Sequence, residues 1–263
     1  MTTSSIRGFD LDHDRQGSGR ILVWGHGLTS SRADEAVPPV LVDWPEATRH
    51  LDVVRYDARG HGRSGYTPDP QGYGWDQMAL DQLALADELG IDRYVAGGAS
   101  LGCATALHAA VAAPDRVEAL VLVIPPTAWE TRAAQADNYR QMGDIIDARG
   151  VEPIIAAGAE LPVPEPFRHL AHWKQRAADR LRAADPVRLA GLFRGAATAD
   201  FPPREAVAAI AVPALILAWA GDPSHPVSTA RELARLLPAA ELHEVTTLDE
   251  FGTWTGRIVE FLA

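Results

Sequence analysis

The clearest chemical signal in the sequence is a serine between two glycines. Gly98, Ser100 and Gly102 form a GxSxG pattern that follows a short apolar run and leads into an alanine-rich run. A strand, a tight turn and a helix in this order predict a nucleophile elbow, which lifts the hydroxyl to a helix N-terminus. We therefore predict that Ser100 is a nucleophile. The alternative is an ordinary N-cap serine in a glycine-rich turn.

A serine nucleophile needs a base, and the nine histidines are the candidates. Six are expected away from the site, in solvated segments, far down the helix after the elbow or inside a strand: His13, His50, His108, His169, His172 and His243. His225 is the preferred base, because it shares a proline-bounded loop with Asp222, whose carboxylate would orient the imidazole. Asp249 or Glu250 could instead hold His225, and His225 could merely cap the following helix.

Two glycine-punctuated loops precede the elbow. The first spans residues 25–28, and the N–H of its Leu28 could donate a hydrogen bond to an oxyanion. His26 in the same loop is expected mainly to hold it in place. The second loop, residues 57–64, reads DARGHGRS. The residues expected to brace this second loop are Asp57, Arg59 and His61.

Strand and helix signals alternate along the chain. A hairpin is predicted within residues 3–14. Further strands are predicted at 20–24, 51–56, 94–99, 119–124, 213–218 and 241–245. Helices are predicted at 37–48, 76–89, 101–113, 228–237 and at the C-terminal end. This alternation predicts an α/β fold with a doubly wound, mostly parallel sheet and the Ser100 strand near its centre.

Residues 126–203 differ from the rest, because helix-period apolar residues, alanine and arginine replace the strand signals. We predict a helical lid here, inserted after the sixth strand, and a core formed by residues 1–125 and 204–263. Aromatic side chains in the lid could line a pocket or form the lid's own core. They are Trp129, Tyr139, Phe167 and Trp173.

Composition narrows the functional class. The chain has 263 residues, and its formal charge of −11 argues against binding to nucleic acid. Cys103 is the single cysteine, so an intrachain disulfide and a cysteine-based metal site are excluded, and no cofactor is predicted. The sequence has no apolar leader and no long apolar run, which predicts a cytoplasmic protein without membrane contact. A small-molecule substrate is the expected partner, and a homodimer remains open.

Taken together, these motifs resemble the α/β-hydrolase superfamily, in its esterase, enol-lactonase and cofactor-free haloperoxidase neighbourhood. Residues 26–28 resemble the family's oxyanion loop, residues 57–64 its D-x-R-G-x-G-x-S loop, and residues 98–102 its elbow. The resemblance implies an eight-stranded sheet and places Asp222 at the family's acid position after the seventh strand. The family's histidine after the eighth strand is missing, because the sequence from 246 to 254, TTLDEFGTW, contains none.

We therefore expect a serine hydrolase of the carboxylesterase or lactonase type, acting by acyl transfer on a small, largely apolar ester or lactone. Ser100, His225 and Asp222 would be catalytic, and the N–H groups of Leu28 and Leu101 would stabilise the oxyanion. The expected substrate-binding residues are Trp129 and Trp173. The alternative is a non-hydrolytic member of the same fold, such as a lyase, a ligand-binding protein or an inactive relative without a placed histidine.

Overall fold

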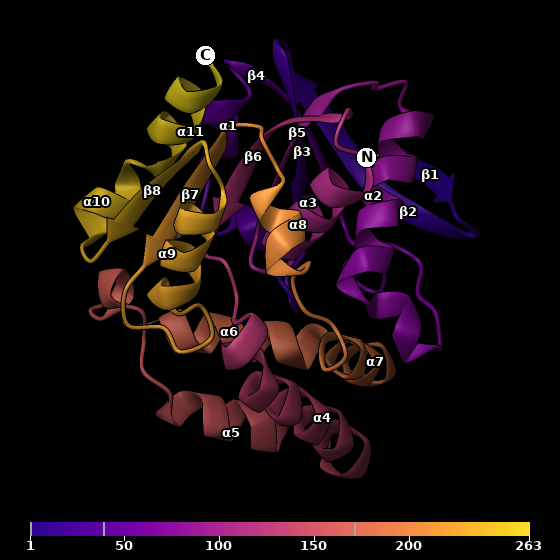
Figure 1. Ribbon diagram of the computed structural model, residues 1–263. Helices are drawn as coiled ribbons and strands as arrows, with labels where there is room; N and C mark the ends of the chain where they lie inside the picture. The colour runs from indigo at the N-terminus through magenta and orange to yellow at the C-terminus, as the bar shows by residue number, and fades with distance from the viewer. Residues whose placement is uncertain (1, 39, 171) are drawn as a thin grey trace.

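An eight-stranded sheet forms the centre of the molecule in this computed structural model, which describes residues 2–38, 40–170 and 172–263 (Figure 1). The strands are β1 (Thr2–Ile6), β2 (Phe9–Gly17), β3 (Arg20–Gly25), β4 (Leu51–Tyr56), β5 (Tyr94–Ala99), β6 (Val117–Val123), β7 (Ala214–Trp219) and β8 (Ala240–Val245). Their order is β1-β2-β4-β3-β5-β6-β7-β8. β2 pairs antiparallel with β1 and β4, and all other neighbours pair parallel, which confirms the predicted mostly parallel sheet.

Two apolar cores lie on opposite faces of the sheet. Successive residues of β6 alternate between them, since Leu120 and Leu122 belong to one core and Val121 to the other. Helices α2 (Trp75–Glu88), α3 (Leu101–Ala112), α8 (Arg204–Ala208) and α9 (Val227–Leu236) cover the first core. Helices α1 (Trp44–Ala47), α10 (Leu248–Gly252) and α11 (Trp254–Leu262) cover the second. Burial on both faces explains why the central strands are apolar throughout.

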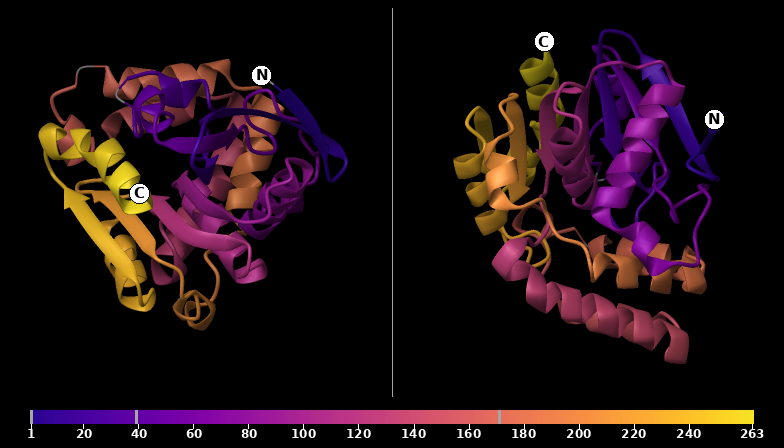
Figure 2. Two further views of the ribbon diagram at one scale, coloured as in Figure 1. Left: turned by 90° about the horizontal axis from the view of Figure 1, so that it is seen from above. Right: turned by 45° about the vertical axis from the view of Figure 1, so that its right-hand side comes forward.

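The segment between β6 and α8 is helical. It contains the 3-10 helices η3 (Trp129–Thr131) and η4 (Glu165–Phe167) and the helices α4 (Arg132–Arg149), α5 (Glu152–Glu160), α6 (Trp173–Ala183) and α7 (Pro186–Ala196). Figures 1 and 2 show α4 to α7 lying across one end of the sheet. We call this segment the inserted helices. It corresponds to the range predicted as a lid, whose domain boundaries stay a prediction.

Two local predictions were wrong. The helix predicted at 37–48 is reduced to α1. A proline disfavours helical backbone in the residue before it, which opposes a helix start at residue 37. Asp43 instead caps a later start, because its carboxylate accepts from the Glu46 N–H. Pro39, within that predicted helix, lies outside the described residues.

His13, predicted to be solvated, is buried in β2, and its Nε2 lies 3.0 Å from the Ser4 hydroxyl. β2 lies inside the sheet between β1 and β4, so this position is covered.

None of the described helices combines the length and apolar character that crossing a bilayer requires.

Three glycines let β3, β5 and α3 meet as bare backbone. A Cβ added to Gly102 would lie 2.0 Å from the Gly25 carbonyl oxygen, and one added to Gly98 would lie 2.5 Å from the same atom. These separations are far below van der Waals contact, and the obstructing atom is backbone that cannot rotate away. The elbow glycines are therefore required by this close approach.

Gly102→Ala should lower the free energy of unfolding by about 1–3 kcal/mol or prevent folding, because the added methyl group collides with the β3 backbone. Gly256→Ala is the matched control, since Gly256 lies in α11 with nothing within 4 Å of its Cβ position. That variant should be about 0.5–1 kcal/mol more stable than the native protein. Urea unfolding measures both, and equal effects would contradict the collision.

Candidate active site

Ser100 occupies the turn between β5 and α3. Its backbone has φ 52° and ψ −107°, a strained conformation for a residue with a side chain. The Ser100 N–H donates to the Val123 carbonyl at 3.0 Å, which ties the turn to the end of β6. The serine therefore stands at the carboxyl edge of the sheet, at the N-terminus of α3, as an elbow requires.

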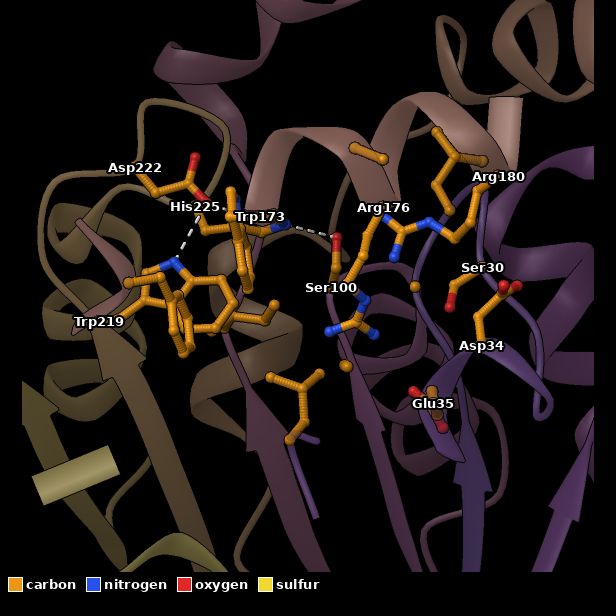
Figure 3. Close-up of a pocket in the computed structure, with 17 residues that line it drawn as sticks. Ser30, Asp34, Glu35, Ser100, Trp173, Arg176, Arg180, Trp219, Asp222 and His225 are labelled. Atoms are coloured by element: carbon orange, nitrogen blue, oxygen red, sulfur yellow. Dashed lines mark hydrogen bonds and ion pairs between the residues drawn. The ribbon is translucent and has the colours of Figure 1, made fainter. Parts of the chain in front are cut away.

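The structure brings the three predicted catalytic side chains into one hydrogen-bonded row (Figure 3). The Ser100 Oγ lies 2.9 Å from His225 Nε2. His225 Nδ1 lies 2.7 Å from Asp222 Oδ2. With Asp222 ionised, Nδ1 donates to the carboxylate, which leaves Nε2 to accept from the serine hydroxyl. The imidazole and the carboxylate that it contacts come from the single loop between β7 and α9, as the proline-bounded spacing predicted.

Asp222 is held as a carboxylate by its surroundings. Burial raises the pKa of Asp222, but the His225 charge and hydrogen bond, the Ser224 N–H and the Trp219 indole N–H outweigh it and lower the pKa to about 2. The Ser224 N–H donates to Oδ1 at 2.9 Å, and Trp219 Nε1 donates to Oδ2 at 3.1 Å. These donors fix the carboxylate in the orientation that His225 needs.

The other acid and base candidates are occupied elsewhere. Glu250 accepts from the N–H groups of Thr246 and Thr247, so it caps the start of α10. Asp249 is exposed in the same first turn. His243 lies within β8, where its Nε2 is 3.5 Å from Arg257 Nη1. Asp222 is thus the carboxylate that contacts His225.

Leu28 and Leu101 are the two residues predicted to supply oxyanion donors, and both lie close to the serine along the chain or in space. Leu28 follows Gly27, whose added Cβ would lie 3.6 Å from Ser100 Cβ, and Leu101 begins α3. Neither N–H has a hydrogen-bond acceptor within the described part of the chain. Two unused donors next to a serine hydroxyl have the composition of an oxyanion hole.

His26 braces this loop. Its Nε2 accepts from the Ala58 N–H at 2.9 Å, and its Nδ1 donates to the Gly27 carbonyl at 2.9 Å. Burial lowers the pKa of His26, so the ring is neutral. The second glycine-punctuated loop is braced similarly, since Asp57 accepts from the N–H groups of Arg32 and Arg63.

A cavity of about 190 Å³ opens beside Ser100 and the base. Phe167, Trp173 and Trp219 give it an aromatic wall, and Phe167 stacks on Trp173 with ring centroids 4.2 Å apart. The predicted substrate-binding residue Trp173 therefore lines the cavity. The space is limited to a small ligand.

The position of Trp129 corrects the other substrate-binding prediction. Its ring packs edge-on against Phe201 at 5.6 Å, and its indole N–H donates to the Pro202 carbonyl at 3.1 Å. Trp129 thus belongs to the packing between the inserted helices and the sheet, and it does not line the Ser100 cavity. Tyr139 is likewise internal to the inserted helices, stacked on Phe193.

Sequence reasoning missed the charged side of the cavity. Arg176 and Arg180 of α6 and Glu35 line it, opposite the aromatic wall. A signal existed, because Trp173, Arg176 and Arg180 are spaced i, i+3 and i+7 and so share one helix face. The sequence does not indicate that this helix face lines the cavity beside Ser100, which the tertiary structure shows.

Burial raises the pKa of Glu35 to about 8, against the opposing effect of the Trp24 indole N–H that donates to it at 3.0 Å. Glu35 is therefore mostly uncharged at neutral pH.

Over residues 2–38, 40–170 and 172–263, no three His, Cys, Asp or Glu side chains group as a metal site would require.

An elbow serine at the carboxyl end of a central parallel strand, followed along the chain by an acid and then a histidine, is typical of α/β hydrolases. The family model described as alpha/beta hydrolase fold matches residues 21–251, and the chain belongs to this family.

Individual relatives cover nearly the whole chain. A putative carbamate hydrolase RutD of Caulobacter segnis is 27% identical, over 100% of this chain and 99% of that protein. The crystal structure of a hydrolase from Pseudomonas aeruginosa is 26% identical, with a TM-score of 0.84 over 100% of this chain and 98% of that one. The enol-lactonase of Burkholderia xenovorans has a TM-score of 0.77 at 23% identity over 99% of both chains, a likeness of fold.

The Asp222 carboxylate should stabilise the fold in a pH-dependent way. Its folded pKa of about 2 lies below the ordinary 3.8, so the contribution is present above pH 4 and is lost as the pH falls through about 2. A shift of this size corresponds to about 2–3 kcal/mol. Urea unfolding should show Asp222→Asn less stable by about that amount at pH 6, with a gap that shrinks toward pH 2.

Asp249→Asn is the control, because it removes the same charge from an exposed position. It should change the free energy of unfolding by less than about 0.5 kcal/mol at either pH. A gap for Asp222→Asn that stays constant across this range would show that the carboxylate charge contributes nothing to the fold.

Proposed function

We propose that this protein is a serine hydrolase that acts by acyl transfer on a small ester or lactone. The row from Ser100 Oγ through His225 to Asp222, with separations of 2.9 and 2.7 Å, is the observation that carries the proposal. A serine hydroxyl is a weak nucleophile at its own pKa and gains reactivity when a positioned imidazole accepts its proton.

The reaction would proceed in two halves. Ser100 Oγ attacks the carbonyl carbon while His225 Nε2 accepts the hydroxyl proton, and the negative oxygen is received by the N–H groups of Leu28 and Leu101. His225 then returns the proton to the leaving alcohol, and an acyl-serine ester remains. Water attacks this ester with His225 again as base, which releases the acid and restores Ser100.

Asp222 would serve as the orienting group. It holds the Nδ1–H of His225, so that Nε2 faces Ser100, and it stabilises the imidazolium formed in each half-reaction. Two relatives, a putative carbamate hydrolase and an enol-lactonase, carry names that describe hydrolysis at a carbonyl carbon, which supports acyl transfer. The non-hydrolytic alternative assumed that no histidine is placed beside the serine, and the 2.9 Å separation of His225 Nε2 and Ser100 Oγ supports hydrolysis instead.

Ser100→Ala and His225→Ala should each lower kcat for a 4-nitrophenyl ester by about 10^4- to 10^6-fold, because nucleophile and base act as a unit. His243→Ala is the matched control and should retain near-native rates, since this residue lies in β8 away from Ser100. A fluorophosphonate should label Ser100 in the native protein, as mass spectrometry would show. Ester hydrolysis that depends on Ser100 but survives His225→Ala would refute the base assignment.

Trp173→Ala should change the selectivity for acyl chain length, because it removes an aromatic wall of the cavity. The ratio of kcat/KM for 4-nitrophenyl butyrate over octanoate should shift by about tenfold or more. Trp129→Ala, from the same inserted helices but outside the cavity, should leave this ratio unchanged. If both variants slow all esters equally, the inserted helices do not set specificity.

A further inference from the structure

Arg180 is a partly buried cation without a partner. Its guanidinium makes no hydrogen bond or ion pair with any described residue, and its Nε is fully enclosed. Burial lowers the pKa of this group, with Asp34 as the opposing charge. A guanidinium has five donors and is costly to remove from water unless an anion compensates it. Among the described residues no carboxylate lies within ion-pair distance of this guanidinium, and Asp34 acts on it only from further away.

The unpartnered guanidinium faces the candidate active site. Arg180 and Arg176 both line the Ser100 cavity from α6, and Figure 3 shows their side chains directed toward the space beside Ser100. Arg176 donates to the Val37 carbonyl, which ties the helix to the segment before α1. The two arginines thus form one positively charged wall.

The acids near this wall leave it positively charged. Glu35 is mostly neutral at pH 7, as described above. Asp34 carries one negative charge, and its carboxylate accepts from the Ser31 hydroxyl at 2.7 Å. Asp222 is committed to His225. The guanidinium groups of Arg176 and Arg180 therefore face one carboxylate, that of Asp34. The wall keeps a net positive charge that a ligand could neutralise.

The arrangement also assigns the side of the substrate that this charge would meet. In Figure 3 Ser100 lies between His225 on one side and Arg180 on the other. His225 must protonate the leaving group, so the leaving alcohol lies on the histidine side. The acyl part then extends toward Arg180.

We propose that Arg180, together with Arg176, binds a carboxylate at the end of the substrate's acyl part, so that monoesters of short dicarboxylic acids are preferred over neutral esters. The inference rests on the proposed hydrolase function and names its substrate class. A planar guanidinium matches a carboxylate through two parallel N–H···O bonds, which fixes both the charge and the direction of the acyl chain.

The test compares 4-nitrophenyl butyrate with mono-4-nitrophenyl succinate, in which a carboxylate replaces the terminal methyl group. The native protein should show a higher kcat/KM for the succinate ester. Arg180→Gln should lower the succinate-to-butyrate ratio by about 10- to 100-fold, the range expected for a lost charged hydrogen bond. Arg180→Lys keeps the positive charge but lacks the planar guanidinium. Its succinate-to-butyrate ratio should lie between those of the native protein and Arg180→Gln.

Arg182→Gln is the matched control. Arg182 is also on α6, but its exposed side chain pairs with Glu152 at 2.8 Å. This variant should keep the native ratio. An Arg180→Gln ratio equal to that of the native protein, while Ser100-dependent hydrolysis persists, would overturn the carboxylate subsite and leave the proposed function standing.

Calorimetry with succinate separates the two claims, because binding requires no turnover. Succinate should bind to Ser100→Ala, and the double variant Ser100→Ala/Arg180→Gln should bind it about 10- to 100-fold more weakly. If no ester is hydrolysed but this Arg180-dependent binding is found, the subsite stands and the hydrolase function fails. Absent binding, or binding that Arg180→Gln leaves intact, overturns the subsite.

Discussion

The contact of three bare backbones is the constraint on which the site depends. Gly25 at the end of β3 lies so close to Gly98 and Gly102 that a side chain at either elbow position would strike its carbonyl group. This approach brings the loop after β3, with the Leu28 N–H, beside the serine. It also accompanies the positive φ of Ser100, which aims the hydroxyl away from the sheet. The turn that carries Ser100 and the loop that carries Leu28 are therefore placed by one packing contact.

Asp222 and His225, which form a hydrogen-bonded row with Ser100, both lie in the loop after β7, and the segment after β8 has a different role. Where the family's histidine is expected, this chain has Phe251, whose ring lies 4.8 Å from Phe167 and 4.8 Å from Trp254. An aromatic cluster thus occupies the region that would otherwise carry the base. This cluster joins the second core of the sheet to the inserted helices. Its ring contacts stabilise the packing between these two parts of the molecule.

Helix α6 combines two opposite chemical requirements on one face. Trp173 stacks on Phe167 and anchors the helix to the aromatic cluster. Arg180, about two turns further along the helix, carries a guanidinium without an ion-pair partner among the described residues. Burial of the rings offsets the cost of holding a cation out of water. The stacked rings thereby hold α6, and with it the backbone of Arg180, against the aromatic cluster.

The sequence by itself determined the features that are encoded locally. Glycines two residues before and after Ser100, apolar runs of strand length, and Asp222 three residues before His225 each act within a few residues, so spacing alone predicts the elbow, the sheet and the loop. Tertiary structure decided which helix face meets the cavity. Trp129 and Trp173 are equivalent aromatic residues by pattern, and Arg176 and Arg180 resemble surface cations. Their roles depend on packing against strands far away in the chain, which periodicity does not encode.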